Sequence, residues 1–249
     1  MNTLDPVVWE NRRTTRLFSE ENKTIPDEDL KYLATVINNI PSQCSIKSHF
    51  WMYLGQGDED MKMRTWLADN IYYMTNKEEH GDDKEHMLAV VQAPAVLVCV
   101  RTSTPWANPE EGKSAEDQNH LADRSEGFVA GAILSTLLNM GYSVATFGCT
   151  HGMHAEGNGR EKCETFTKMI KERFGTELEN MINTYPGKQG NWDDISFFPG
   201  LTNSFGPEAI DSLAPTEGEL ETWVSKAGKE YKFINGTKLR TPVDSTVGF

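Results

Sequence analysis

The chain has 249 residues, of which 38% are hydrophobic, and its 37 Asp and Glu residues outnumber its 24 Lys and Arg residues to give a formal net charge of −13. This length and composition are typical of one globular domain with a core of its own. The charge disfavours a nucleic-acid partner, because binding to phosphates needs a basic surface.

The sequence also disfavours a membrane or secreted protein. No stretch approaches the ~20 consecutive apolar residues of a membrane span. Residues 1–10 have neither the basic nor the apolar region of a signal peptide. Four widely spaced cysteines form no C-x-x-C pair, so free thiols are expected. We therefore expect a cytoplasmic protein with no membrane partner.

Hydrophobic spacing predicts helices and strands interspersed along the chain. Residues 11–19 contain two adjacent threonines and no helical stripe, which favours an extended segment. A helix is expected after Pro26, with one apolar face formed by Leu30, Leu33, Ala34 and Ile37. Further along, we expect strands at 50–54, 93–100 and 143–149, and helices at 58–76, 116–140 and 160–174.

Glycines mark features of the last two helices. The helix at 116–140 is apolar almost all round in its second half, so we expect it in the middle of the domain, with Gly127 and Gly131 allowing a neighbour to approach closely. Gly175 is expected to end the helix at 160–174.

The C-terminal part shows weaker patterns. We expect an irregular extension over residues 190–249, with a hairpin around Asn235-Gly236 that joins strands at 231–234 and 237–240. The interspersed helices and strands indicate an α/β or α+β class, and we expect a single domain over residues 1–249.

Basic residues cluster near both ends of this acidic chain. Arg12, Arg13 and Arg16 lie within five positions, and in an extended segment Arg12, Thr14 and Arg16 project to one side. Lys238 and Arg240 share a side by the same rule. Such guanidinium, ammonium and hydroxyl groups suit a phosphate monoester. A solvated cluster of surface charges is the alternative interpretation. Neither glycine-rich nucleotide-binding motif is present.

Several motifs resemble those of the FMN-dependent nitroreductases. Residues 12–18 (RRTTRLF) resemble the family's RRSxRxF signature, and residues 93–98 (APAVLV) resemble its APVLIVV strand. Residues 127–148 are similar to its central helix and WIG-type strand, Tyr185-Pro186 to its GYP motif, and residues 238–240 to its C-terminal K-x-R. The blocks occur in the family's order. One departure concerns residues 41–49, where Ser45, Lys47 and His49 stand in place of the family's Asn, Gln and Trp.

The resemblance implies an α+β fold of three layers, in which helices flank a central mixed, mainly antiparallel sheet. It also implies a homodimer with FMN at the subunit interface, whereas the expected C-terminal extension has no counterpart in the family's motifs. Hydride would pass from NADH or NADPH through FMN to an electron-poor small-molecule acceptor, a nitroaromatic or a quinone, by a ping-pong mechanism. No catalytic side chain and no metal ligand is nominated.

The resemblance assigns the cofactor contacts as follows. The phosphate would be held by Arg12, Thr14, Lys238 and Arg240, with help from the backbone and stem of Arg13. Arg16 would lie near the pyrimidine edge of the flavin ring. Pro41, Ser42, Gln43 and Ser45 would reach the flavin of the partner subunit. The backbone at Phe147 and Gly148 would approach the ring, since a glycine permits close contact.

Three alternatives stay open. Cys149, His151 and His154 with Cys163 form a candidate metal site, for which a loop is the competing interpretation. A reductive dehalogenase or other flavin enzyme of the same fold would differ in the candidate lid, residues 55–83, where we expect Trp66 to pack in the core. A flavin-binding scaffold without enzyme activity is the third alternative.

Overall fold

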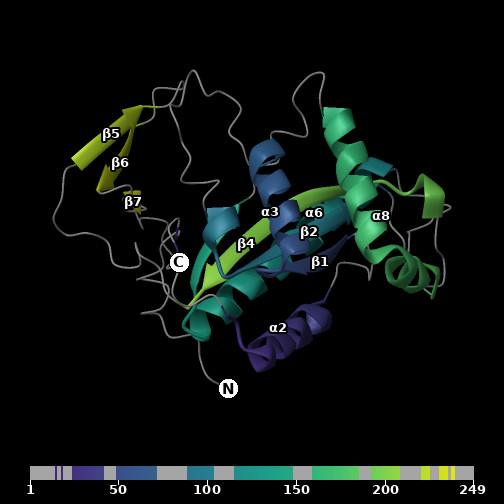
Figure 1. Cartoon of the computed structure of the whole chain (residues 1–249), viewed down its shortest axis with the longest axis horizontal. Coiled ribbons are helices and arrows are strands. Elements are labelled where there is room, and N and C mark those ends of the chain that lie inside the picture. Colours follow the sequence, from purple (N-terminus) through teal and green to yellow (C-terminus); the bar gives the residue numbers. More distant parts are fainter. Residues whose placement is uncertain are drawn as a thin grey trace.

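The computed structural model describes Thr15, Phe18 and residues 24–41, 49–71, 89–103, 115–147, 159–184, 192–207, 220–224, 230–234 and 237–238. Its helices are α2 (Asp27–Asn39), α3 (Asp58–Asn70), α6 (Ala115–Asn139), α8 (Gly159–Thr184) and the short 3₁₀ helix η2 (Trp192–Asp194). Its strands are β1 (His49–Leu54), β2 (Ala95–Thr102), β3 (Ser143–Phe147), β4 (Phe197–Gly206), β5 (Leu220–Val224), β6 (Glu230–Ile234) and β7 (Thr237–Lys238) (Figure 1).

A four-stranded sheet in the order β1-β2-β4-β3 forms the middle of the fold, and every strand pair described in it is antiparallel. Strands β1 and β3 are therefore its two edges. The sheet has α2 on one side and α3 and α8 on the other (Figure 1). This arrangement confirms the expected α+β class with three layers around a mainly antiparallel sheet.

Each face of the sheet has its own apolar cluster, as the two-residue period of a strand requires. On one face, Val96, Val98 and Val100 of β2 pack with apolar residues of α3 and α8. On the other face, Ala95 and Leu97 pack with apolar residues of α2 and α6. Because both faces are covered, β2 is an almost continuously apolar strand, which explains why its sequence was recognisable.

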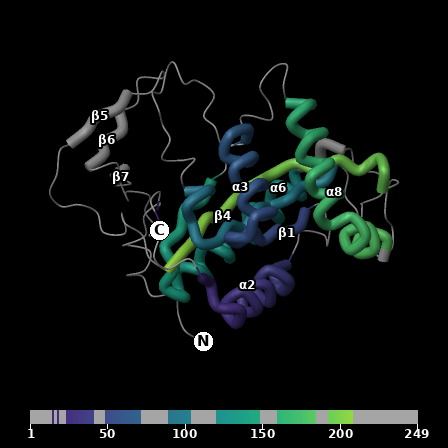
Figure 2. The backbone as a smooth tube through the Cα atoms, in the orientation of Figure 1, coloured from purple at the N-terminus to yellow at the C-terminus, as the bar shows by residue number. Residues whose placement is uncertain are grey.

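Strand β4 is the main element that the sequence left unassigned. Figure 2 traces it through the middle of the molecule, and in the sheet it lies between β2 and β3. Its sequence contains Pro199 and Gly200, residues that normally argue against a central strand. The structure tolerates them because the register with β2 shifts between Val98 and Val100, so that this stretch of β4 forms a bulge.

Two expectations about helices were wrong. Helix α8 does not end at Gly175 but continues to Thr184, because Leu178 and Ile182 extend its buried face. Helix α6 is not enclosed on all sides: its Val129, Ile133 and Leu137 are buried, whereas Phe128 is 67% exposed.

Helix α3 is fixed by a buried arginine. The Arg64 side chain has 0% exposure, and its guanidinium donates hydrogen bonds to the carbonyl oxygens of Val90 (2.8 Å), Gly55 (2.7 Å), Val91 (3.0 Å) and Ala93. Burial lowers the pKa of Arg64 to about 10. Three of these acceptors lie at the end of a helical segment of which residues 89–92 are described, so Arg64 supplies donors to carbonyl groups that have no partner within the helix.

Strands β5, β6 and β7 form a second, three-stranded antiparallel sheet. The expected hairpin is confirmed, because Ile234 of β6 pairs with Thr237 of β7 across the two residues Asn235 and Gly236. The organisation of the chain as a single domain stays a prediction.

Candidate functional site

The N-terminal arginine segment is anchored to the edge of the sheet. The backbone N–H of Thr15 donates a hydrogen bond to the carbonyl oxygen of Val144 in β3, at 3.0 Å. Thr15 is 4% exposed, and Phe18 is 1% exposed within the cluster that α3 and α8 cover. The segment that carries the clustered arginines is thus held beside β3 at Thr15 and in the core at Phe18.

Strand β3 ends at a second predicted site residue. Phe147 is its last residue, is 7% exposed, and pairs with Thr202 of β4. Gly148 follows Phe147 in the sequence, and Leu201 precedes Thr202 in β4. The same end of the sheet carries His49 at the start of β1, which pairs with Arg101 near the end of β2.

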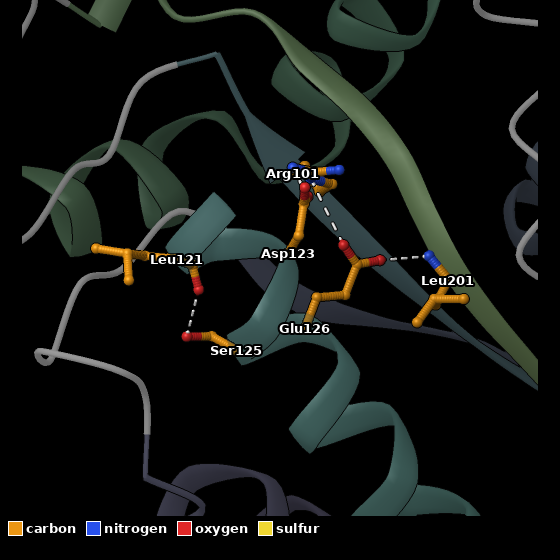
Figure 3. A network of polar contacts seen from close by, with 6 residues as sticks. All are labelled: Arg101, Leu121, Asp123, Ser125, Glu126 and Leu201. Carbon is orange, nitrogen blue, oxygen red and sulfur yellow. Dashed lines mark hydrogen bonds and ion pairs between the residues drawn. The ribbon is translucent and has the colours of Figure 1, made fainter. Parts of the chain in front are cut away.

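A buried carboxylate lies at this end of the sheet (Figure 3). Glu126 of α6 is 5% exposed, and its Oε1 accepts a hydrogen bond from the backbone N–H of Leu201 at 2.5 Å. Its Oε2 lies 3.6 Å from Nε of Arg101, and the same guanidinium forms an ion pair with Asp123. Glu126 therefore binds the bulge of β4 to α6 and to β2.

Gly200 makes room for this carboxylate. A Cβ atom at Gly200 would lie 2.2 Å from Oε1 of Glu126, which is far too close for a side chain to be tolerated without movement. Here glycine is required by the close approach of another residue, not by its backbone angles.

Cys99 of β2 lies beside the same carboxylate. Burial raises the pKa of the Cys99 thiol well above its ordinary value, and the neighbouring charge of Glu126 raises this pKa further. Cys99 is therefore a protonated thiol at neutral pH, without the thiolate character that a nucleophile needs.

An apolar groove of about 920 Å³ runs along β1. It is bordered by α2, by the C-terminal half of α8 and by side chains of β1 from His49 to Tyr53. Ile40, at the end of α2, also lines it, and Pro41 follows as an exposed residue. The groove thus lies at the opposite edge of the sheet from Thr15 and Phe147.

The structure describes three of the predicted cofactor contacts: Pro41, Phe147 and Lys238, the last of which pairs with Phe233 in the small second sheet. The other predicted contacts lie outside the described residues; they are Arg12, Arg13, Thr14, Arg16, Ser42, Gln43, Ser45, Gly148 and Arg240.

Glu126 was not predicted from the sequence. The available signal was that it is the last charged residue before an uncharged stretch, residues 127–140. A carboxylate at the border of an apolar helix can be buried only if donors meet it, and those donors come from strands that are distant in the sequence.

Two alternatives can be followed in part. Trp66 of α3 stacks on Phe166 of α8 with ring centroids 5.9 Å apart, which confirms that it packs against the core. Of the proposed metal ligands, only Cys163 is described; it is half-buried. No group of three or more potential ligands that could hold a metal ion occurs in the described parts of the chain. None of the described helices has both the length and the hydrophobicity of a membrane span.

No protein-family model matches this chain, and no curated protein matches it. Solved structures do match. The Bacillus subtilis protein ydfN, provisionally assigned as a nitroreductase, shares 13% identity, and the match covers 98% of this chain and 97% of that chain with a TM-score of 0.54. A provisionally assigned NAD(P)H:FMN oxidoreductase from Staphylococcus epidermidis shares 13% identity over 88% of this chain and 93% of that one, with a TM-score of 0.53.

A third match is a provisionally assigned nitroreductase from Exiguobacterium sibiricum, solved in complex with FMN, with 12% identity, 85% and 91% coverage and a TM-score of 0.52. At this level of identity, such matches define an architecture. The chain therefore has a three-layer α+β fold of the class found in flavin oxidoreductases. More specifically it has the nitroreductase fold, which confirms in structure the resemblance noted in the sequence.

Proposed function

We propose that this protein is an FMN-dependent oxidoreductase. In this proposal it transfers hydride from NADH or NADPH, by way of bound FMN, to an electron-poor small molecule such as a nitroaromatic or a quinone. The observation that supports this most directly is the hydrogen bond between Thr15 and Val144. It joins the arginine segment to the strand that ends at Phe147, so two segments predicted to hold one cofactor are neighbours in a fold shared with an FMN complex.

The alternation of side chains about Thr15 supports a phosphate site. Because Thr15 is buried and neighbouring side chains of an extended segment point to opposite sides, Thr14 and Arg16 are expected to face away from the core. There they are available to a bound anion. Arg12 and Arg13 complete this part of the proposed site, and Lys238 and Arg240 are proposed to join it.

The width of the sheet supports a site between two subunits. Strands β1 and β3 are separated by three inter-strand spacings, roughly 14 Å at about 4.8 Å each. Residues 41–45 precede β1 at one edge, whereas Phe147 ends β3 at the other. We therefore propose that Pro41, Ser42, Gln43 and Ser45 contact the FMN that is held mainly by the partner subunit, while Phe147 and Gly148 approach the FMN of their own.

The open face of α6 supports a homodimer. Phe128 is 67% exposed, and Cβ atoms built at Gly127 and Gly131 would meet nothing within 4 Å among the described residues. Neither glycine is needed to make room for a described residue of its own chain, and an exposed aromatic ring lies next to them. Such a face suits close packing of a second helix. We propose that the same face of a second copy covers them.

The chemistry of this proposal is divided between cofactor and chain. When bound, FMN supplies the capacity to accept and donate hydride. The chain binds its phosphate through the basic residues, orients its ring against Phe147 and Gly148, and leaves room for donor and acceptor in turn, as a ping-pong mechanism requires. A donor of the NAD(P)H type is present in the cytoplasm, where we propose that the protein acts.

The decisive experiment is a visible absorption spectrum of the purified protein, followed by release and identification of any chromophore. We expect a flavin spectrum, about one FMN per chain as the proposed stoichiometry requires, and oxidation of NADH or NADPH when a quinone or nitroaromatic is added. A colourless protein that takes up no added FMN would refute the proposal. Uptake of FMN without oxidation of either nicotinamide would indicate the flavin-binding scaffold instead.

A further inference from the structure

Glu126 is buried beside the stretch of β4 that pairs with the last described residues of β3. Phe147 of β3 pairs with Thr202 of β4, and Leu201 is the residue of β4 that precedes Thr202. The N–H of Leu201 donates its hydrogen bond to the carboxylate of Glu126.

The bulge in β4 explains why Leu201 needs such a partner. Val98 pairs with Thr202, but Val100 pairs with Pro199, so Gly200 and Leu201 both stand opposite Cys99. A bulge leaves a backbone group without its ladder partner, and a buried N–H without an acceptor is unfavourable. Glu126 is the acceptor, and Gly200 lacks the side chain that would displace it.

The carboxylate also has a cationic partner. Its second oxygen lies 3.6 Å from Nε of Arg101, an ion pair. Arg101 is further fixed by Asp123 and by its position over the ring of Phe198, 5.4 Å from the centroid. Figure 3 shows Glu126 of α6 between Arg101 of β2 and Leu201 of β4.

We infer that Glu126 is a positioning residue of the proposed flavin site, which fixes the bulge of β4 and thereby the position of Phe147, the partner of Thr202, relative to the flavin ring. This inference rests on the proposed function. In this inference Glu126 acts on the cofactor only through Leu201, Thr202 and Phe147.

Three variants and one control test this role. Glu126→Ala removes the acceptor, Gly200→Ala displaces it with a methyl group, and Glu126→Gln keeps an oxygen that accepts the N–H of Leu201. The control is Asp123→Asn, which weakens the half-exposed ion pair with Arg101 but does not touch β4. Far-ultraviolet circular dichroism establishes which variants fold; if Glu126→Ala does not, Gly200→Ala and Glu126→Gln still make the comparison.

The first readout needs no flavin. Hydrogen exchange of the apoprotein, followed by mass spectrometry, reports on peptides that cover residues 143–147 and 198–204. We expect at least tenfold faster exchange in both peptides for Glu126→Ala and Gly200→Ala, and rates close to wild type for Glu126→Gln and Asp123→Asn. Unchanged exchange in Glu126→Ala and Gly200→Ala would overturn the inference.

The second readout is the flavin itself. In the FMN-loaded protein, we expect altered visible circular dichroism and at least threefold weaker FMN binding in Glu126→Ala and Gly200→Ala, with Glu126→Gln and Asp123→Asn like wild type. A wild-type flavin signal in variants that have lost exchange protection would overturn the positioning role. If wild type takes up no FMN while the exchange results are as expected, the proposed function fails and the flavin role fails with it, but the contact between Glu126 and Leu201 stands.

Discussion

The phenolic hydroxyl of Tyr142 donates a hydrogen bond to the carboxylate of Asp29, across 113 positions of the sequence. The contact joins the turn after α6 to the first turn of α2. Tyr142 is 8% exposed, and its ring packs edge-on against Phe205 with centroids 5.6 Å apart. Burial, and then the neighbouring Asp29, raise the pKa of Tyr142 above its ordinary value of 10.0.

Tyr142→Phe tests this contact. At neutral pH we expect a loss of about 1.5–3 kcal/mol in the free energy of unfolding, because the hydrogen bond has a charged acceptor. Because the pKa is raised in the folded state, the stability that it contributes is complete below pH 10.0 and declines above it. The free energy of unfolding in urea should therefore fall more steeply above pH 10.0 for wild type than for the variant.

The control is Tyr32→Phe, in the same helix as Asp29, because Tyr32 is 57% exposed. Its free energy of unfolding should match that of wild type both at neutral pH and above the ordinary tyrosine pKa. Equal pH dependence of wild type and Tyr142→Phe would contradict the assignment.

Arg64→Met tests the buried arginine. The substitution leaves carbonyl oxygens of Gly55, Val90, Val91 and Ala93 without these donors, so we expect a loss of about 3 kcal/mol or more. The measurement is chemical denaturation at neutral pH. Lys62→Met is the matched control, since Lys62 lies in the same helix, is 70% exposed and pairs only with Glu59 among described residues; we expect it to change stability by less than about 0.5 kcal/mol.

Two glycines should respond to alanine with opposite signs. Gly175 lies inside α8 with nothing within 4 Å of a built Cβ, so Gly175→Ala should raise the free energy of unfolding by about 0.5–1 kcal/mol. Gly141 has φ of 85°, so Gly141→Ala should lower it by about 1 kcal/mol. A thermal melt of both variants beside wild type checks the signs. A lower melting temperature for Gly175→Ala would contradict the helix-propensity argument, and an equal or higher one for Gly141→Ala would contradict the argument from its positive φ.

Arg16→Ala tests the proposed phosphate and ring contacts. We expect the dissociation constant for FMN to rise at least tenfold, because a charge-assisted contact is worth about 1.5–3 kcal/mol. Fluorescence titration of the apoprotein with FMN measures it. Arg160→Ala is the control, because Arg160 is 92% exposed and pairs with Glu164 on the surface of α8. Equal FMN affinity in the two variants would remove Arg16 from the site.

Phe128→Glu tests the dimer. A carboxylate in a packed helix interface would be left without a partner, so we expect monomers at concentrations where wild type is dimeric. Sedimentation velocity distinguishes the two states. Lys168→Glu also adds negative charge, but at a side chain of α8 that is 75% exposed, and it should leave the dimer intact. A dimeric Phe128→Glu protein would place the interface elsewhere.

The sequence predicted those elements whose pattern is local. Strands β1, β2 and β3 were recognisable because each is a short apolar run, and the hairpin from β6 to β7 because Asn-Gly prescribes its turn. Strand β4 was not, because Pro199 and Gly200 make sense only beside the bulge opposite Cys99. Helix α8 passes Gly175 because Leu178 and Ile182 find partners in the core, which its sequence does not reveal.

The candidate site divides in the same way. The arginine segment was found because cations are conspicuous in an acidic chain, and its neighbour Thr15 is indeed bound to β3. Glu126 was not found, since the groups that make its burial tolerable come from β2 and β4, which lie 25 or more positions away in the sequence. Local chemistry identifies ligand groups, but the residues that position them depend on long-range packing.

The central place of β4 also sets the order in which this protein can assemble. Strand β3 has no contact with β2 in the sheet, and both acquire their shared partner only when residues 197–206 become available. A chain emerging from the ribosome can pair β1 with β2 early, but β3 keeps an unsatisfied edge for some fifty further residues. Pairing strands that are so far apart in the sequence slows folding, and meanwhile the unpaired strand edges are exposed to other chains. Soluble expression should therefore be most sensitive to changes that delay the docking of β4.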